Sequence, residues 1–135
     1  MLDTDMLSEI GKGIDPIVVR NAVAYRKKHG FLTISVISIM EVIQGYQRVG
    51  SSARIEVFQN SLLAEEVISF DPLAAALAGQ IAGKLDRAGL PIGRCDPMIA
   101  AIALSRGFEL VTGNTSHYQR LSLIGHPLVL MNWRF

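Results

Sequence analysis

The chain has 135 residues, half of them hydrophobic, and a mean hydropathy of +0.32. Thirteen Lys and Arg against twelve Asp and Glu leave a net charge of +1, which excludes a histone-like basic binder and an acidic tail but allows a locally charged site. The single cysteine, Cys95, excludes an internal disulfide. No apolar run reaches the ~18 residues that span a bilayer, and Asp3 and Asp5 stand where a signal peptide is basic. We therefore expect one domain over residues 1–135 in a soluble, cytoplasmic protein.

The first half of the chain alternates apolar runs with helix-forming stretches. Asp15-Pro16 is typical of a helix start, an acidic cap followed by proline in the first turn. Ser38 is the expected cap of the next helix, and Glu41 lies at capping-box spacing from it. The expected elements are a strand stub at Met1-Leu2, a short helix at Met6–Ile10, a helix at Ile17–His29, a strand at Phe31–Ile37, a helix from Ser38 to about Val49 and a helix at Ala53 to about Glu65.

The second half continues the alternation. Asp71-Pro72 and Asp96-Pro97 each predict the start of a helix. The expected elements are a strand at Val67–Phe70, a helix at Leu73–Ala88, a loop at Gly89–Gly93, a helix at Met98–Leu104, a strand at Phe108–Thr112, a loop at Gly113–Thr115 and a strand at Pro127–Met131. Strands that alternate with helices predict an α/β fold, a three-layer α/β/α sandwich with a central parallel sheet of four to five strands.

Three carboxylates lie in apolar surroundings: Asp3 after the first strand stub, Glu41 within an apolar stretch, and Asp96 before an apolar helix. An ionised carboxylate in such a place is costly unless it is paired, hydrogen-bonded or bound to a cation. Ligands of open α/β sheets gather at the carboxyl ends of the strands, where Asp3 and the turn after Thr112 fall. Oxygen ligands without a His or Cys cluster favour Mg²⁺ or Mn²⁺ over zinc.

Each of these acids also has a structural interpretation. Asp3 can be a turn residue, Glu41 the second half of a capping box with Ser38, and Asp96 an ordinary helix cap before Pro97. Residue spacing leaves both interpretations open.

Four segments, in order, resemble the motifs of PIN-domain nucleases, specifically the VapC-type toxins of bacterial toxin–antitoxin pairs. The first, Leu2–Glu9, is similar to the usual opening of Leu-Asp-Thr-Asn, an apolar pair and Ser-Glu. The other three segments are Ile34–Glu41, Gly89–Ala101 and Leu110–Thr115. In addition, Asn132-Trp133 is similar to a common ending of these toxins.

The resemblance implies a PIN-like fold and a Mg²⁺-dependent endoribonuclease (Mn²⁺ being the alternative cation) that cuts RNA, sometimes tRNA. It also implies a VapB-type antitoxin as partner and a homodimer. By motif position, Asp3 and Asp96 are the main metal ligands, and Glu41 is a ligand directly or through water. Thr4 and Ser35 orient these carboxylates, and Asn114 takes the polar position of the fourth motif.

RNA that approaches an acidic site needs cations nearby, and Arg94, two residues before Asp96, is our first candidate. The further candidates are Arg20, Arg48 and Arg120. Two positions depart from the family pattern. Asp5 replaces the usual Asn and adds a charge beside the site, where it can either assist the metal or face solvent. His117 stands where many relatives carry an acid, and the loss of that acid leaves one-metal and two-metal chemistry both open.

Two other functions compete with the nuclease. A noncatalytic PIN-like module would bind RNA or a protein partner without cutting. Asp3-Thr4-Asp5 after a strand also fits a haloacid-dehalogenase-like phosphatase, in which Asp3 would be the nucleophile and Asp5 the general acid.

Overall fold

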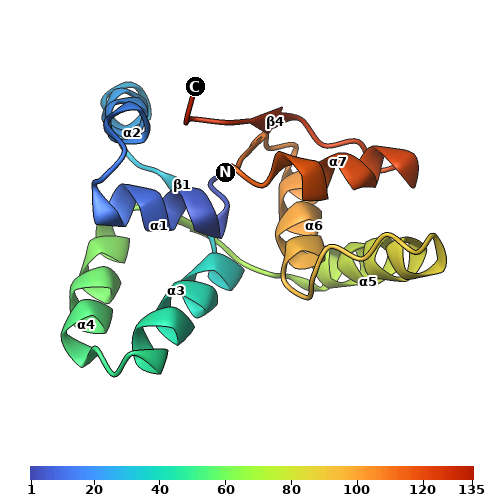
Figure 1. Ribbon diagram of the computed structural model, residues 1–135, viewed down its shortest axis with the longest axis horizontal. Coiled ribbons are helices and arrows are strands. Elements are labelled where there is room, and N and C mark those ends of the chain that lie inside the picture. Colours follow the sequence, from blue (N-terminus) through green and yellow to red (C-terminus); the bar gives the residue numbers. More distant parts are fainter.

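The computed structural model describes all 135 residues, and helices dominate it (Figure 1). In this view the N-terminus lies between a group formed by α1 to α4 and a group formed by α5 to α7. None of the helices combines the length and apolar character needed to cross a membrane. The helices are α1 (Thr4–Lys12), α2 (Pro16–His29), α3 (Val36–Arg48), α4 (Ser52–Ser61), the 3-10 turn η1 (Leu62–Ala64), α5 (Pro72–Arg87), α6 (Asp96–Arg106) and α7 (Thr115–Leu123). The strands are β1 (Thr33–Ser35), β2 (Glu66–Ile68), β3 (Leu110–Val111) and β4 (Leu130–Met131).

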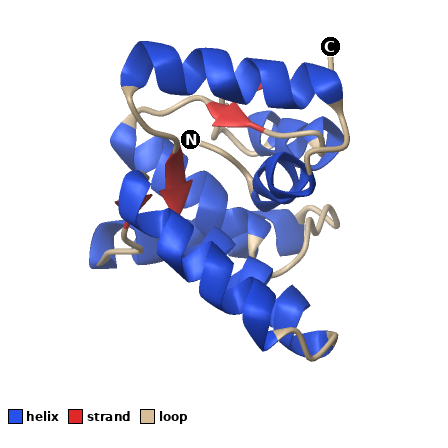
Figure 2. Cartoon of the chain, turned by 90° about the vertical axis from the view of Figure 1, so that its left-hand side faces the viewer, coloured by secondary structure: helices blue, strands red, loops and turns tan.

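The strands are short and parallel, and the N-terminal residues join them into one layer. β1 pairs with β2 and β3 pairs with β4, while Leu2 forms parallel bridges to both Ile34 and Val111. The order across the layer is therefore β4, β3, Leu2, β1, β2. The backbone bonds of this central segment run from Leu2 N to Thr33 O at 2.8 Å and from Asp3 N to Val111 O at 2.9 Å. The expected parallel sheet of four to five strands is confirmed, with strands of only two or three residues between the helices (Figure 2).

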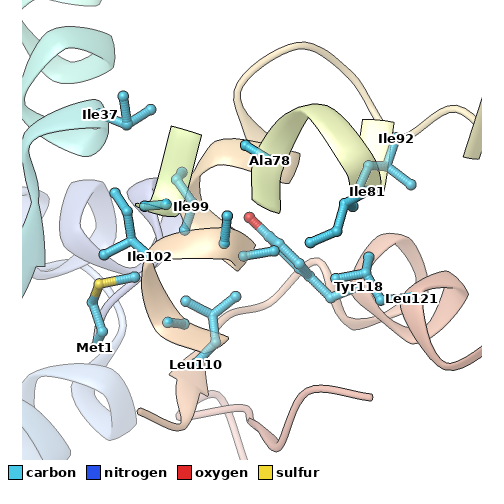
Figure 3. Close-up of a cluster of buried hydrophobic side chains, with 14 of the residues drawn as sticks. Met1, Ile37, Ala78, Ile81, Ile92, Ile99, Ile102, Leu110, Tyr118 and Leu121 are labelled. Carbon is cyan, nitrogen blue, oxygen red and sulfur yellow. The ribbon is translucent and has the colours of Figure 1, made fainter. Parts of the chain in front are cut away.

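The two faces of this layer carry separate cores. Successive residues of a strand point to opposite faces, so Leu2 and Val111 pack with α1 and α2, whereas Met1 and Leu110 pack with α5, α6 and α7. Figure 3 shows the second core, into which Tyr118 extends from α7 with its hydroxyl at the inner end of the side chain. Helices on both faces of a parallel sheet make the predicted three-layer α/β/α arrangement.

Two helices start at other residues than predicted. In both cases a carboxylate that was considered as part of the helix cap does not have this role. β1 ends at Ser35, whose hydroxyl caps α3 by accepting from Ser38 N at 3.1 Å, so the capping box of Ser38 with Glu41 is wrong. Asp96 is the first residue of α6 rather than its cap, and the capping residue, Cys95, makes no side-chain bond to the helix. Asp71, in a similar Asp-Pro pair, does cap its helix by accepting from Ala74 N at 2.8 Å.

The helix α7 was not expected from the sequence. It is polar, and its capping residue Asn114 makes no side-chain bond to the helix, so neither periodicity nor a cap marks its start. Its consequence is functional, because α7 brings His117 and Tyr118 to the ends of β3 and α6.

Candidate active site

Asp3 is the most buried carboxylate of the site. It follows the bridging residue Leu2, caps α1, and has only 5% of its surface exposed. Its Oδ1 accepts hydrogen bonds from Thr4 N at 2.8 Å and from the Tyr118 hydroxyl at 3.1 Å. Its Oδ2 accepts from the Thr112 hydroxyl at 2.8 Å. Three donors from three parts of the chain therefore fix its orientation.

Burial is the main reason why the pKa of Asp3 is raised from 3.8 to about 6. The hydrogen bonds from Thr112 and Thr4 oppose this rise, whereas the negative charges of Asp5 and Asp96 add to it. The pKa of Asp96 is also raised, again mainly by burial, with a contribution from Asp5. Like charges thus converge at the carboxyl ends of the central strands, where a bound cation would be stabilised.

Asp96 reaches this place from the first turn of α6. Its Oδ2 lies 3.1 Å from Nδ1 of His117, and this contact lowers the pKa of Asp96 against the effect of burial. The same His117 nitrogen lies 2.8 Å from Nδ2 of Asn114, at the start of α7. Asn114 therefore lies at the site, where it contacts the imidazole and not a carboxylate.

Glu41 is linked to the site through Thr4. The Thr4 hydroxyl oxygen lies 2.6 Å from Oε1 of Glu41 and 2.9 Å from the Ser38 hydroxyl. Ser35 is fully buried and acts on the helix backbone as the cap of α3, which carries Glu41. Burial, followed by the charges of Glu41 and Asp96, raises the pKa of the Cys95 thiol, so both acids lie near this cysteine.

Asp5 is held by two groups that the sequence did not point to. Its Oδ2 accepts from Gly113 N at 2.9 Å and lies 3.3 Å from Nη2 of Arg134, which also pairs with Glu9 at 2.6 Å. A Cβ on Gly113 would lie only 1.4 Å from Nη1 of Arg134, so the arginine occupies the space that any larger residue at 113 would need. Asp5 is thus paired with an arginine of the same chain, although its negative charge still acts on Asp3 and Asp96.

Three residues of the site were not predicted from the sequence, and a fourth residue, Arg94, was predicted as an RNA contact. Thr112 ends a predicted strand at the sheet edge where ligands gather, a signal that could have identified it. Tyr118 and Arg134 lie outside every predicted element and have no local signal. Arg94 is exposed and forms no salt bridge in the structure, so its guanidinium is open to solvent in the loop that leads to Asp96.

The donor set fits a hard divalent cation in an open site. Nowhere do three His, Cys, Asp or Glu side chains come close enough together to hold a metal ion on their own. Mg²⁺ rarely uses a cage made only of protein ligands, because it keeps several waters and is bound through one or two carboxylates together with substrate phosphates. Asp3 and Asp96 supply two such carboxylates, and their raised pKa values show the cost of leaving them without a cation.

Comparison with known proteins agrees with this geometry. The family model described as "PIN domain" matches residues 1–121. The "tRNA(fMet)-specific endonuclease VapC" of Shigella flexneri is 34% identical over 90% of this chain and 90% of its own length. DNA-bound VapBC from Salmonella typhimurium contains a chain that is 30% identical, with a TM-score of 0.82 over 98% of this chain and 96% of that one. VapBC2 from Rickettsia felis, bound to a promoter DNA fragment, contains one that is 25% identical, with a TM-score of 0.80 over 98% and 97%.

The first of these relatives is named as an endonuclease, which agrees with a nuclease and not with the phosphatase alternative. The resemblance of the four sequence motifs is confirmed by the family match, the relatives and the fold. The chain belongs to the PIN domain family, among the VapC ribonucleases.

Proposed function

We propose that this chain is the toxin of a VapBC toxin–antitoxin pair, an endoribonuclease that cuts tRNA in the cytoplasm and is silenced by a VapB-type antitoxin. The observation that carries the proposal is the convergence of Asp3, Asp5 and Asp96 at one edge of the parallel sheet, where the charges of Asp5 and Asp96 raise the pKa of Asp3 and the charge of Asp5 raises the pKa of Asp96. The choice of tRNA rests on the VapC relative from Shigella flexneri, and the choice of partner on the VapBC complexes.

PIN-domain nucleases generally depend on a divalent cation, and we propose Mg²⁺, with Mn²⁺ as an effective substitute. Asp3 and Asp96 would hold it directly and Glu41 through water. When bound, the cation supplies charge neutralisation at the phosphodiester and an activated water for attack on phosphorus. His117 in place of an acid, and Asp5 already paired with Arg134, favour a single cation.

The residues of the chain prepare this site before substrate arrives. Thr112 and Tyr118 fix Asp3, and Thr4 holds Glu41 on the same side. Arg94 is exposed two residues before the second acid and is available to a backbone phosphate. Residues 1–135 form one PIN domain in this proposal, because both cores meet at the same central strands.

The antitoxin would cover an apolar groove beside Glu41. A groove of about 980 Å³ lies between α1, α3 and α4 and has Glu41 in its wall. Ile14, Val49 and Val57 line it with 80%, 68% and 71% of their surfaces exposed. An amphipathic segment of a VapB-type partner would bury these side chains and block access to the acids.

Cleavage of a purified tRNA pool tests the function. The protein, free of partner, is incubated with Mg²⁺, Mn²⁺ or EDTA, and Asp3→Asn is assayed in parallel. Discrete fragments that require the cation and disappear in the variant support the proposal. If the folded protein binds the tRNA but produces no fragments with either cation, it is a noncatalytic binding module and the proposal fails.

A further inference from the structure

The hydrogen bonds to Asp3 leave it a single free lone pair. An ionised carboxylate offers about four lone-pair sites, two on each oxygen. On Oδ1 both are used, one by Thr4 N at 2.8 Å and one by the Tyr118 hydroxyl at 3.1 Å. On Oδ2 the Thr112 hydroxyl uses one at 2.8 Å. Only one site, on Oδ2, is open to a cation.

The donors that fill Oδ1 belong to fixed parts of the fold, and Asp96 is the one other carboxylate within hydrogen-bond reach of the Tyr118 hydroxyl. Thr4 N belongs to the first turn of α1, for which Asp3 is the cap. Tyr118 has 1% of its surface exposed, and its ring is packed in the core, where it extends from α7 toward Ala78 (Figure 3).

We propose that Tyr118 makes Asp3 a one-oxygen ligand and thereby selects Mg²⁺ or Mn²⁺ over Ca²⁺. Ca²⁺ takes six to eight oxygens at about 2.3–2.6 Å and often binds both oxygens of one carboxylate, whereas Mg²⁺ requires a compact octahedron with single oxygens and waters. With Oδ1 filled, Asp3 cannot offer Ca²⁺ its second oxygen. The inference rests on the proposed function, because it takes Asp3 as a cation ligand. Tyr118 is a positioning residue, since it acts through Asp3.

Tyr118→Phe is the direct test, because it removes one oxygen and keeps the packed ring. Calorimetric titration of the full chain with Mg²⁺ and with Ca²⁺ gives the ratio of the two dissociation constants. We expect the variant to shift that ratio toward Ca²⁺ by about fivefold or more, mainly through tighter Ca²⁺ binding. Tyr46→Phe is the matched control, because Tyr46 packs against Phe58 on the helices α3 and α4, away from Asp3. It should leave the ratio unchanged.

Infrared spectroscopy of the wild-type protein supplies a second measurement that does not depend on how well the variant folds. The separation of the two carboxylate stretching bands differs between one-oxygen and two-oxygen binding, and comparison of the wild-type, Asp3→Asn and Asp96→Asn spectra at saturating cation assigns each band to its carboxylate. We expect one-oxygen binding with Mg²⁺ and with Ca²⁺. Two-oxygen binding with Ca²⁺ in the wild-type protein would overturn the inference.

The outcomes separate this inference from the proposed function. If the wild-type protein binds Mg²⁺ but Tyr118→Phe leaves the ratio unchanged, or weakens both ions equally, Tyr118 is only a packing residue and the inference alone fails. If the wild-type protein binds neither ion, both the inference and the proposed cation site fail.

Discussion

Asp3→Asn should stabilise the metal-free protein at neutral pH while it abolishes the activity. Asp3 has a pKa of about 6 in the folded protein against 3.8 as its ordinary value, mainly because it is buried. A difference of about 2 pKa units corresponds to about 3 kcal/mol. The folded protein therefore carries an ionised Asp3 at neutral pH at that cost.

The sign of the pH dependence follows from proton binding. Between about pH 4 and pH 6 the folded protein holds a proton on Asp3 that the unfolded chain has released. The contribution of Asp3 to the free energy of unfolding thus rises as the pH falls from about 6 to about 4, and it is constant outside this window. Asp3→Asn removes this slope. We subtract the free energy of unfolding of the wild-type protein from that of the variant at each pH. This difference should be about 3 kcal/mol larger at pH 7.5 than at pH 4.

Part of the gain at pH 7.5 is lost again in hydrogen bonding. Asn at position 3 can still accept from Thr4 N and Tyr118, but its amide would face the Thr112 hydroxyl that now donates to Oδ2. The pKa of about 6 already includes the bond from Thr112 to the ionised carboxylate, so the further loss is that of a bond to a neutral group, about 0.5–1.5 kcal/mol. We therefore expect a net gain of about 2 kcal/mol at pH 7.5 and a net loss of about 1 kcal/mol at pH 4.

Urea unfolding in EDTA at pH 7.5 and pH 4 measures both differences. Asp71→Asn is the control, because Asp71 is a more exposed helix cap whose role asparagine can take over. If Asp3→Asn changes the free energy of unfolding by the same amount at both pH values, to within about 0.5 kcal/mol, the burial penalty on Asp3 does not exist and the reasoning is refuted.

Further predictions concern the side chains around the acids. Gly113→Ala should displace Arg134 and cost about 1 kcal/mol, as should Arg134→Gln, and the double variant should be no less stable than either single one in urea unfolding. Thr4→Ala should slow tRNA cleavage about 10-fold by releasing Glu41, and Thr4→Ser should restore it in the same assay. The homodimer remains a prediction from family resemblance, and light scattering should give twice the 14.7 kDa of one chain.

The sequence allowed the fold to be predicted because its helix starts and strands carry local signals. Asp15-Pro16 predicted a capped helix, and the structure has one at that place. The strands proved shorter than the apolar runs around them. Val36 and Ile37 are β-branched and were predicted as strand, but the buried cap at Ser35 starts α3 there instead.

The site could be predicted only in part, because its chemistry depends on contacts between distant segments. The three acids Asp3, Glu41 and Asp96 were recognisable from their apolar neighbours, and this pattern reflects the place they take in the fold. Tyr118 and Arg134 lie 115 and 129 residues from the carboxylates they contact. A core aromatic and a terminal arginine have no local pattern that distinguishes them from packing or surface residues.

The most direct test of the central claim compares two acids with the same local sequence. Asp96-Pro97 and Asp71-Pro72 both lie at helix starts, but only Asp96 lies at the carboxylate cluster. We predict that Asp96→Asn reduces Mg²⁺-dependent tRNA cleavage by about 100-fold or more, because the cation contributes several kcal/mol of charge stabilisation, while Asp71→Asn stays within about twofold of the wild-type rate. A wild-type cleavage rate in folded Asp96→Asn would contradict the assignment of this cluster as the active site.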